Sequence, residues 1–138
     1  MIALLQRVRE AHVDIAGQRV ATIGPGVLAL IGVTRADGPA QAERLLERIL
    51  GYRLFADSDG KMNRSVRDIG GGLLLVPQFT LVADTDKGMR ASFTPAAAPD
   101  DGRRLFEHLL AEARRQHRPV ESGVFGADMQ VTLTNDGP

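Results

Sequence analysis

Two short apolar runs constrain the fold of this chain more than any other feature. Residues 27–31 and 73–76 carry only aliphatic side chains, without the polar alternation of a strand that has one face in water. A run of this length is typical of a strand buried on both faces. Both runs are far shorter than the roughly 20 residues that a membrane-spanning helix needs. The sequence therefore predicts a central strand at 27–33 and a further strand at 73–82.

Four more strands are expected around these two. Residues 2–15 have the pattern of a long strand, and a short glycine-containing turn joins them to residues 19–23 in a hairpin. Near the end of the chain, residues 120–124 and 129–134 have strand composition and flank Gly126. We expect these two segments to pair with each other.

Two helices are expected to cover the sheet. The first follows Asp37, which can cap it, and has Pro39 in its first turn. Its apolar face carries Leu45, Leu46, Ile49 and Leu50. The second begins at Pro99 and ends near Arg114 and Arg115, where positive charge suits the helix dipole. Its apolar face carries Leu105, Phe106, Leu109 and Leu110.

Together these elements predict an α+β fold, with a mainly antiparallel sheet or barrel-like core and two packed helices. A short helical turn is expected at 65–69. The chain has 138 residues, of which 43% are apolar, so it can bury roughly two-thirds of its unfolded-chain surface in one core. No repeat or linker divides the sequence. We therefore expect a single domain, 1–138.

The composition narrows the possible functions. The chain has 17 Lys and Arg residues and 17 Asp and Glu residues, so no overall positive field attracts nucleic acid, and any RNA contact must be local. The absence of cysteine excludes a disulfide framework, thiolate metal sites and a cysteine nucleophile. The opening residues 1–5 are too short an apolar stretch for a signal peptide. We expect a soluble, cytoplasmic protein with no membrane segment.

Common catalytic motifs are not found. His12, His108 and His117 lack the spacing of a metal site, so we expect no metal and interpret them as surface or packing residues. Residues 60–61 match only the end of a phosphate-binding loop, and the glycines at 70–72 precede a strand instead of a helix. No Gly-x-Ser-x-Gly motif favours a serine hydrolase. These motifs alone leave the activity undefined.

Three segments carry a resemblance to a known family. They are the opening Met1-Ile2-Ala3-Leu4-Leu5-Gln6-Arg7-Val8, the central Pro77-Gln78-Phe79-Thr80-Leu81 and the terminal Asn135-Asp136-Gly137-Pro138. Other matching segments lie between them, among them Gly88-Met89-Arg90-Ala91-Ser92-Phe93 and Phe125-Gly126-Ala127-Asp128-Met129. Along essentially its whole length, the chain resembles the D-aminoacyl-tRNA deacylases, also called D-tyrosyl-tRNA deacylases.

The resemblance implies an enzyme that hydrolyses the ester between a D-amino acid and the terminal adenosine of tRNA, and also acts on glycine mischarged on tRNA-Ala. It implies chiral proofreading in translation, aminoacyl-tRNA as the partner molecule and a homodimer. We expect no cofactor, because the sequence contains no convincing ligand cluster. Two departures from the family pattern are visible. Pro77 stands where the family has a serine. The chain also ends at Pro138, where the family continues, so we expect the family's final strand to be missing.

The resemblance also implies the catalytic residues Gln78, Phe79 and Thr80. Main-chain N–H groups around Phe79 and Thr80 are candidates to bind the oxyanion that forms during hydrolysis. Read without the family, Phe79 would be a core residue and Thr80 an ordinary strand residue. Thr80 as a covalent nucleophile stays open, although no adjacent base is identifiable. The family pattern favours substrate positioning and the ribose 2′-hydroxyl instead.

Substrate selection is assigned by the resemblance to Gly137, Pro138 and Arg7. In the family the Gly-Pro peptide bond is cis and enters the active site of the partner subunit, where it rejects an L side chain. Arg7 is expected to hold this segment through a backbone carbonyl near Gly137, with a solvated strand residue as the alternative. Phe125 and Met129 are expected to contact the adenine, with ordinary core packing as the alternative.

Two other classes of function stay open on the sequence. The first is a catalytically silent RNA- or nucleotide-binding module of the same fold, in which Pro77 marks lost chemistry. The second is a purely structural homo-oligomer, which neither binds nor hydrolyses aminoacyl-tRNA. Deacylation of matched D-, L- and glycyl-tRNA separates the three.

Overall fold

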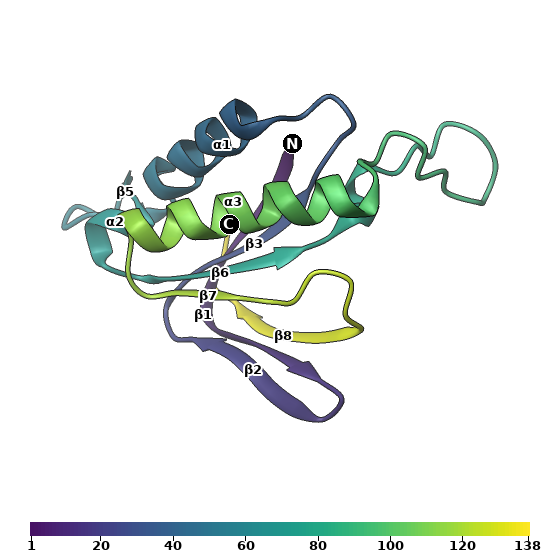
Figure 1. Cartoon of the computed structure of the whole chain (residues 1–138). Helices are drawn as coiled ribbons and strands as arrows, with labels where there is room; N and C mark the ends of the chain where they lie inside the picture. The colour runs from purple at the N-terminus through teal and green to yellow at the C-terminus, as the bar shows by residue number, and fades with distance from the viewer.

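The computed structural model describes all residues, 1–138, and contains one six-stranded sheet with helices packed on one face (Figure 1). The strands of this sheet are β1 (Ile2–Ile15), β2 (Gln18–Ile23), β3 (Gly26–Gly32), β6 (Gly72–Pro77), β7 (Val120–Ser122) and β8 (Met129–Asn135). The helices are α1 (Pro39–Gly51), the single turn α2 (Val66–Ile69), α3 (Pro99–Gln116) and the 3-10 helix η1 (Phe79–Val82). Strands β4 (Phe55–Ala56) and β5 (Met62–Arg64) form a separate pair. The predicted α+β class is confirmed.

The sheet combines antiparallel and parallel pairs. β1 is its longest strand and pairs antiparallel with β2, β3 and β8. β3 pairs parallel with β6, and β6 pairs parallel with β7. Because β2 also lies against β6 and β7, the sheet curls into a nearly closed barrel. This agrees with the predicted barrel-like core.

The predicted pairing of the last two strands is wrong. β7 lies beside β6, with Val120 opposite Leu73, whereas β8 lies beside β1, with Met129 opposite Ile15. The physical reason is that β6 is buried and needs hydrogen-bonding partners along both edges. β3 occupies one of these edges and β7 the other, which leaves β8 to pair with β1.

The two apolar runs lie at the centre of the sheet and fill a core on each of its faces. On the helix side the core contains Val27, Ala29, Ile31, Leu73 and Leu75, with residues of α1 and α3. Inside the barrel it contains Val8, Ala11, Val13, Ala21, Ile23, Leu28, Leu74 and Val76. Successive side chains of a strand point to opposite faces, so β3 and β6 each contribute to both cores. The prediction that 27–33 is buried on both faces is confirmed.

β6 ends earlier than predicted. The strand stops at Pro77, opposite Ile31, and residues 79–82 form η1 instead of continuing the strand. Pro77 has no N–H group to extend the ladder, and its neighbour β3 ends at Gly32. The last bond to β3 runs from the Gln78 N–H to the Ile31 carbonyl at 2.7 Å. The chain therefore leaves the sheet directly after Pro77.

Asp37 does not cap α1 as predicted. Gly38 is the N-cap, and its N–H donates to the Gln41 side chain at 2.9 Å. The Asp37 carboxylate accepts instead from the N–H and hydroxyl of Thr34 and lies 2.7 Å from the Met1 ammonium. Burial raises the pKa of Asp37, but these hydrogen bonds outweigh it, and the pKa is lowered below its ordinary value. Asp37 thus ties the N-terminus to the connection between β3 and α1.

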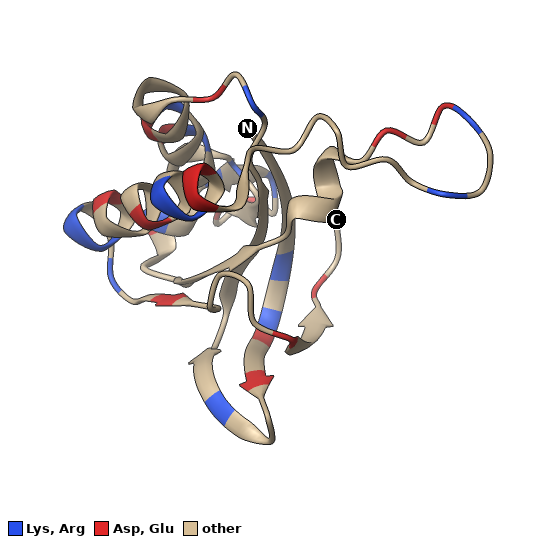
Figure 2. Ribbon diagram, turned by 45° about the vertical axis from the view of Figure 1, so that its right-hand side comes forward, with Lys and Arg blue, Asp and Glu red and all other residues tan.

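The two long helices lie where the sequence predicts them. The short helical turn predicted at 65–69 is confirmed as α2, and Ser65 caps it. Positive and negative side chains are interspersed along α1 and α3, so neither helix presents a face of a single sign (Figure 2). None of the helices is long and apolar enough to cross a membrane.

Candidate functional site

A hollow of about 280 Å³ opens where β6 leaves the sheet, and we call it the β6 hollow. It is lined by Pro77, Gln78, Phe79, Gly126, Ala127, Asp128, Met129 and Val131. These residues come from the end of β6, the start of η1, the segment that leads into β8 and the start of β8 itself. Three of the predicted site residues, Gln78, Phe79 and Met129, therefore lie together. This makes the β6 hollow the candidate site.

Phe79 stands in the wall of this hollow and outside the core. The residue is 55% exposed, so the core position considered from the sequence is wrong. Its ring packs edge-on against Phe93, with the ring centroids 5.0 Å apart. Phe79 also lines a much smaller apolar hollow together with Phe125. An exposed aromatic ring held in place by a neighbouring ring can provide a contact surface for a ligand.

The backbone of η1 begins with two N–H groups that lack an intrahelical partner. Its hydrogen-bond ladder starts at the Leu81 N–H, which donates to the Gln78 carbonyl at 3.2 Å. The N–H groups of Phe79 and Thr80 precede this bond and have no partner within η1. Adjacent backbone donors of this kind can bind a developing negative charge. The oxyanion role of these groups stays a prediction.

The Thr80 hydroxyl is bound by a neighbouring amide. Nε2 of Gln78 donates to Oγ1 of Thr80 in a short hydrogen bond. An amide is not a base, so this contact orients the hydroxyl without activating it as a nucleophile. Both residues lie outside the strand in which the sequence placed them, for the reason given for Pro77.

Each of the two adenine candidates, Phe125 and Met129, lines a hollow that Phe79 also lines. Met129 shares the β6 hollow with Phe79, and Phe125 shares the smaller apolar hollow. The Arg103 guanidinium lies over the Phe125 ring, 5.1 Å from its centroid. Both candidates are partly exposed. Their contact with adenine stays a prediction.

Arg7 binds backbone next to the C-terminus, the contact that the resemblance implies. Its Nε donates to the Asp136 carbonyl at 2.7 Å, and its Nη1 donates to the Leu54 carbonyl at 2.5 Å. The Asp136 N–H donates in return to the Arg7 carbonyl at 2.8 Å. We call Arg7, Asp136 and Gly137 the C-terminal brace. A guanidinium with two carbonyl partners is fixed in place and is not the solvated strand residue considered as the alternative.

Gly137 fits the brace because it has no side chain. Its φ is 79°, in the left-handed region that favours glycine. A Cβ atom added at this position would lie 2.8 Å from Nη2 of Arg7. The cis peptide bond of the structure joins Arg118 to Pro119, and the one implied between Gly137 and Pro138 is not observed in the single chain. It stays a prediction for the assembled protein, as does the role of Pro138.

One copy of the chain does not bring all predicted site residues together. Gln78, Phe79 and Met129 line the β6 hollow, and Phe125 lines the smaller apolar hollow that shares Phe79. Arg7 and Gly137 belong instead to the C-terminal brace, which Pro138 follows in the chain. No residue of the brace lines the β6 hollow.

Sequence reasoning missed part of the site. Gly126, Ala127 and Asp128 line the β6 hollow but were not singled out as site residues. The available signal was their position between the two adenine candidates, with a left-handed turn at Gly126, where φ is 80°. Arg103 and Phe93 were missed because only the folded chain brings them to Phe125 and Phe79.

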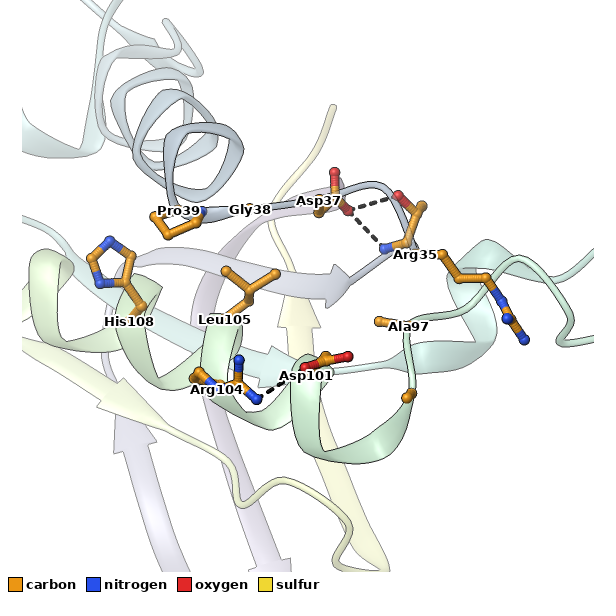
Figure 3. Close-up of a pocket in the computed structure, with 11 residues that line it drawn as sticks. Arg35, Asp37, Gly38, Pro39, Ala97, Asp101, Arg104, Leu105 and His108 are labelled. Carbon is orange, nitrogen blue, oxygen red and sulfur yellow. Dashed lines mark hydrogen bonds and ion pairs between the residues drawn. The ribbon is translucent and has the colours of Figure 1, made fainter.

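The largest hollow, of about 460 Å³, lies elsewhere, between the starts of α1 and α3 (Figure 3). Most of its charged side chains already have partners: Arg104 lies 3.0 Å from Asp101, His108 lies 3.1 Å from Glu43, and Nε of Arg35 donates to the Thr94 carbonyl at 2.5 Å. It contains none of the predicted site residues. We therefore keep the smaller β6 hollow as the candidate site.

The histidines lie outside the β6 hollow, as expected of surface and packing residues. Nε2 of His117 lies 2.7 Å from the Gly71 carbonyl, and Nε2 of His12 lies 3.6 Å from the Asp14 carboxylate. No group of three or more His, Cys, Asp or Glu side chains is arranged to hold a metal ion.

Comparison with known sequences gives a family match over nearly the whole chain. A sequence model of the family described as D-Tyr-tRNA(Tyr) deacylase matches residues 4–138. A D-aminoacyl-tRNA deacylase from Thioalkalivibrio sulfidiphilus is 68% identical over 138 residues, covering 100% of this chain and 93% of the relative. A D-aminoacyl-tRNA deacylase from Alkalilimnicola ehrlichii is 67% identical over 138 residues, covering 100% of this chain and 92% of the relative.

Two solved structures share the fold. The c-Myc DNA Unwinding Element Binding Protein is 34% identical, with a TM-score of 0.93 over 99% of this chain and 93% of that chain. A probable eukaryotic D-amino acid tRNA deacylase is 18% identical, with a TM-score of 0.85 over 99% of this chain and 94% of that chain. The second match bears on the fold alone.

The fold of this chain, a nearly closed barrel with two long helices on one face, is thus shared with these two solved structures. The match over residues 4–138 makes the assignment specific. This chain belongs to the D-Tyr-tRNA(Tyr) deacylase family.

Proposed function

We propose that this chain hydrolyses the ester bond between a D-amino acid and the 3′-terminal adenosine of tRNA. The reaction releases the free amino acid and a tRNA that can be charged again, so it proofreads translation. The observation that carries the proposal is family membership over residues 4–138. The proposal includes glycine mischarged on tRNA-Ala, because glycine has no side chain for a chiral filter to reject. We place the reaction in the cytoplasm, with the aminoacyl-tRNA pool.

The proposed reaction is the addition of water to the ester carbonyl. The carbonyl oxygen becomes an oxyanion, the bond to the ribose 3′-oxygen then breaks, and that oxygen takes a proton. We assign the oxyanion to the N–H groups of Phe79 and Thr80, which have no partner within η1. The Thr80 hydroxyl, bound by Gln78, is assigned to positioning the substrate. Assistance to the attack is assigned to the 2′-hydroxyl of the substrate, since no side-chain base contacts Thr80 in the structure.

The adenine of the substrate is proposed to bind beside Phe125 and Met129. A flat ring and a polarizable thioether suit the face of a base. Phe79 supports this arrangement because it contacts the hollows that both residues line. The adenine would then lie at one side of the β6 hollow and the ester at the N–H groups of η1.

Rejection of L-amino acids is proposed to need a second copy of the chain. In one copy the C-terminal brace and the β6 hollow lie apart, so Gly137 and Pro138 do not reach their own hollow. A two-fold dimer, the commonest closed assembly, offers them the hollow of the partner. Rigid backbone there would occupy the space of an L side chain, whereas a D side chain points away from it.

The test is deacylation of matched D-, L- and glycyl-tRNA by the purified protein. We expect turnover of the D and glycyl substrates without added metal or cofactor, and little turnover of the L substrate. Absence of turnover on all three, with tRNA still bound, would reject the proposed function.

A second candidate is a catalytically silent nucleic-acid-binding module. It is favoured by the structural relative whose name describes binding to a DNA unwinding element, and by Pro77, which lacks the hydroxyl of the family's serine. Binding without turnover would support this candidate. A gain of several orders of magnitude in the Pro77→Ser variant would also support it, because the natural sequence would then be catalytically impaired.

A further inference from the structure

We propose that residues 83–93, which we call the projecting loop, bind the phosphates of the nucleotides that precede the terminal adenosine of tRNA. Lys87 and Arg90 make the contacts. The inference rests on the proposed function but concerns residues outside the β6 hollow. The projecting loop follows η1 and extends far from the body of the protein (Figure 1).

The root of the projecting loop is fixed beside the β6 hollow. Asp84 and Ser92 exchange backbone hydrogen bonds, at 2.8 and 2.9 Å. Phe93 then packs its ring against Phe79, which lines the hollow. A nucleotide chain that leaves the hollow on this side therefore passes the loop.

The outer part of the loop carries two free cations. Residues 84–93 are all exposed, and neither Lys87 nor Arg90 forms a salt bridge. Asp84 lies at the paired root, whereas Asp86 adjoins Lys87, and both carboxylates line one hollow of about 300 Å³ together with the two cations. Oδ1 of Asp84 accepts the Asp86 N–H at 3.0 Å, so this carboxylate is turned toward the loop's own backbone. Neither cation is neutralised by a salt bridge within the loop, so both can bind an anion.

The shape of the loop suits an extended ligand. Gly88 turns the chain at its tip, with a φ of 71°, and Met89 beside it is fully exposed. Three residues lie between the tip and the paired root, which gives a reach of about 10 Å. A stacked nucleotide strand rises about 3.4 Å per nucleotide, so this reach covers about two or three nucleotides.

The two cations without salt-bridge partners, Lys87 and Arg90, favour the tRNA backbone as the occupant. The chain has no net charge, so its contacts to nucleic acid must be local. Lys and Arg side chains that bind phosphates fix the position of a nucleic acid without reading its sequence. Two unpaired cations beside a hollow proposed to bind the last nucleoside therefore provide a subsite for the single-stranded 3′ end.

The experiment compares two substrates in one set of variants. One substrate is D-aminoacyl-tRNA, and the other is 3′-(D-aminoacyl)adenosine, which has no phosphate. The test variant is Lys87→Ala/Arg90→Ala. The matched control is Arg44→Ala/Arg114→Ala, which removes two exposed cations that form no salt bridge and lie on α1 and α3.

We expect the loop variant to raise KM for D-aminoacyl-tRNA about tenfold with kcat unchanged, and to leave hydrolysis of the adenosine ester unchanged. The dependence of log KM on log salt should become less steep by about 1.4, because each lost phosphate contact to a single strand contributes about 0.7. The control should resemble the wild type on both substrates.

Three results would overturn the inference. An unchanged KM for tRNA would show that the loop binds no phosphate. Equal losses on both substrates would show that the loop shapes the hollow instead, and equal losses in the control would show a general charge effect. If the wild type hydrolysed neither substrate, the proposed function would fail and this inference with it. Wild-type activity on both substrates with an unaffected loop variant would reject the inference alone.

Discussion

The C-terminal brace and the β6 hollow differ in how far their polar groups are satisfied within one chain. In the brace, Arg7 has two carbonyl partners, and Asp136 returns a backbone hydrogen bond. In the hollow, Phe79 is 55% exposed, and the first N–H groups of η1 have no intrahelical partner. The difference indicates two roles: the hollow can receive a ligand, whereas the brace holds a segment rigid so that it can be presented.

Both regions form where a strand of the sheet ends. The hollow exists because Pro77 cannot extend the ladder of β6, so the chain turns into η1. The brace exists because β1 and β8 pair up to Val8 and Asn135. The next residues, Arg7 and Asp136, then stay bonded beyond the end of the ladder.

The largest expected effect comes from breaking the brace. Arg7→Ala removes both carbonyl contacts, so residues 137–138 lose their fixed position. We expect kcat/KM for D-aminoacyl-tRNA to fall about 100-fold, or the preference for D- over L-aminoacyl-tRNA to weaken by the same factor. The matched control is Arg9→Ala, because Arg9 makes only an exposed pair with the Asp136 carboxylate at 3.3 Å. Equal effects of the two variants would show that the bracing contact is not specific.

Removing the proposed adenine contacts should have an effect of intermediate size. We expect it to weaken substrate binding without changing the discrimination between D and L substrates. Phe125→Ala and Met129→Ala should each raise KM about tenfold for D- and glycyl-tRNA alike, because stacking is lost while the chiral filter is kept. Val124→Ala, an exposed neighbour that does not line the hollow, serves as the control. A change in the ratio of D to L turnover would contradict the separation of the two regions.

The smallest effect is expected at Thr80. Thr80→Ala removes the hydroxyl that Gln78 binds but keeps the backbone N–H, so kcat should stay within about tenfold of the wild type. Single-turnover kinetics on D-aminoacyl-tRNA measures this directly. Complete loss of turnover, with folding and tRNA binding intact, would instead identify Thr80 as a covalent nucleophile.

The parts of the fold that could be predicted from sequence are those set by local pattern. The apolar runs in β3 and β6 identify buried strands because both faces of these strands are covered. The apolar faces of α1 and α3 identify helices for the same local reason. The partner of β8 and the end of β6 depend on which edges of the sheet are free, and that is decided only by the whole sheet.

The site is less predictable for a related reason. Arg7 and Asp136 are 129 residues apart in sequence, so only the family resemblance connected Arg7 with the C-terminal segment. Phe93 and Arg103 complete the surroundings of Phe79 and Phe125 from other elements, and no local pattern indicates them. The resemblance pointed to Gln78 and Phe79, but their place outside the strand followed only from the structure.

The central claim is that the hollow of one copy works with the C-terminal segment of another. It is tested most directly in a heterodimer, isolated with two different tags, of one chain that lacks residues 137–138 and one that carries Phe125→Ala and Met129→Ala. Each homodimer is defective, but the heterodimer contains one site with an intact hollow and an intact Gly137-Pro138 segment. We predict that it regains about half of the wild-type kcat/KM for D-aminoacyl-tRNA and rejects the L substrate. Activity no higher than the mean of the two homodimers would contradict the account.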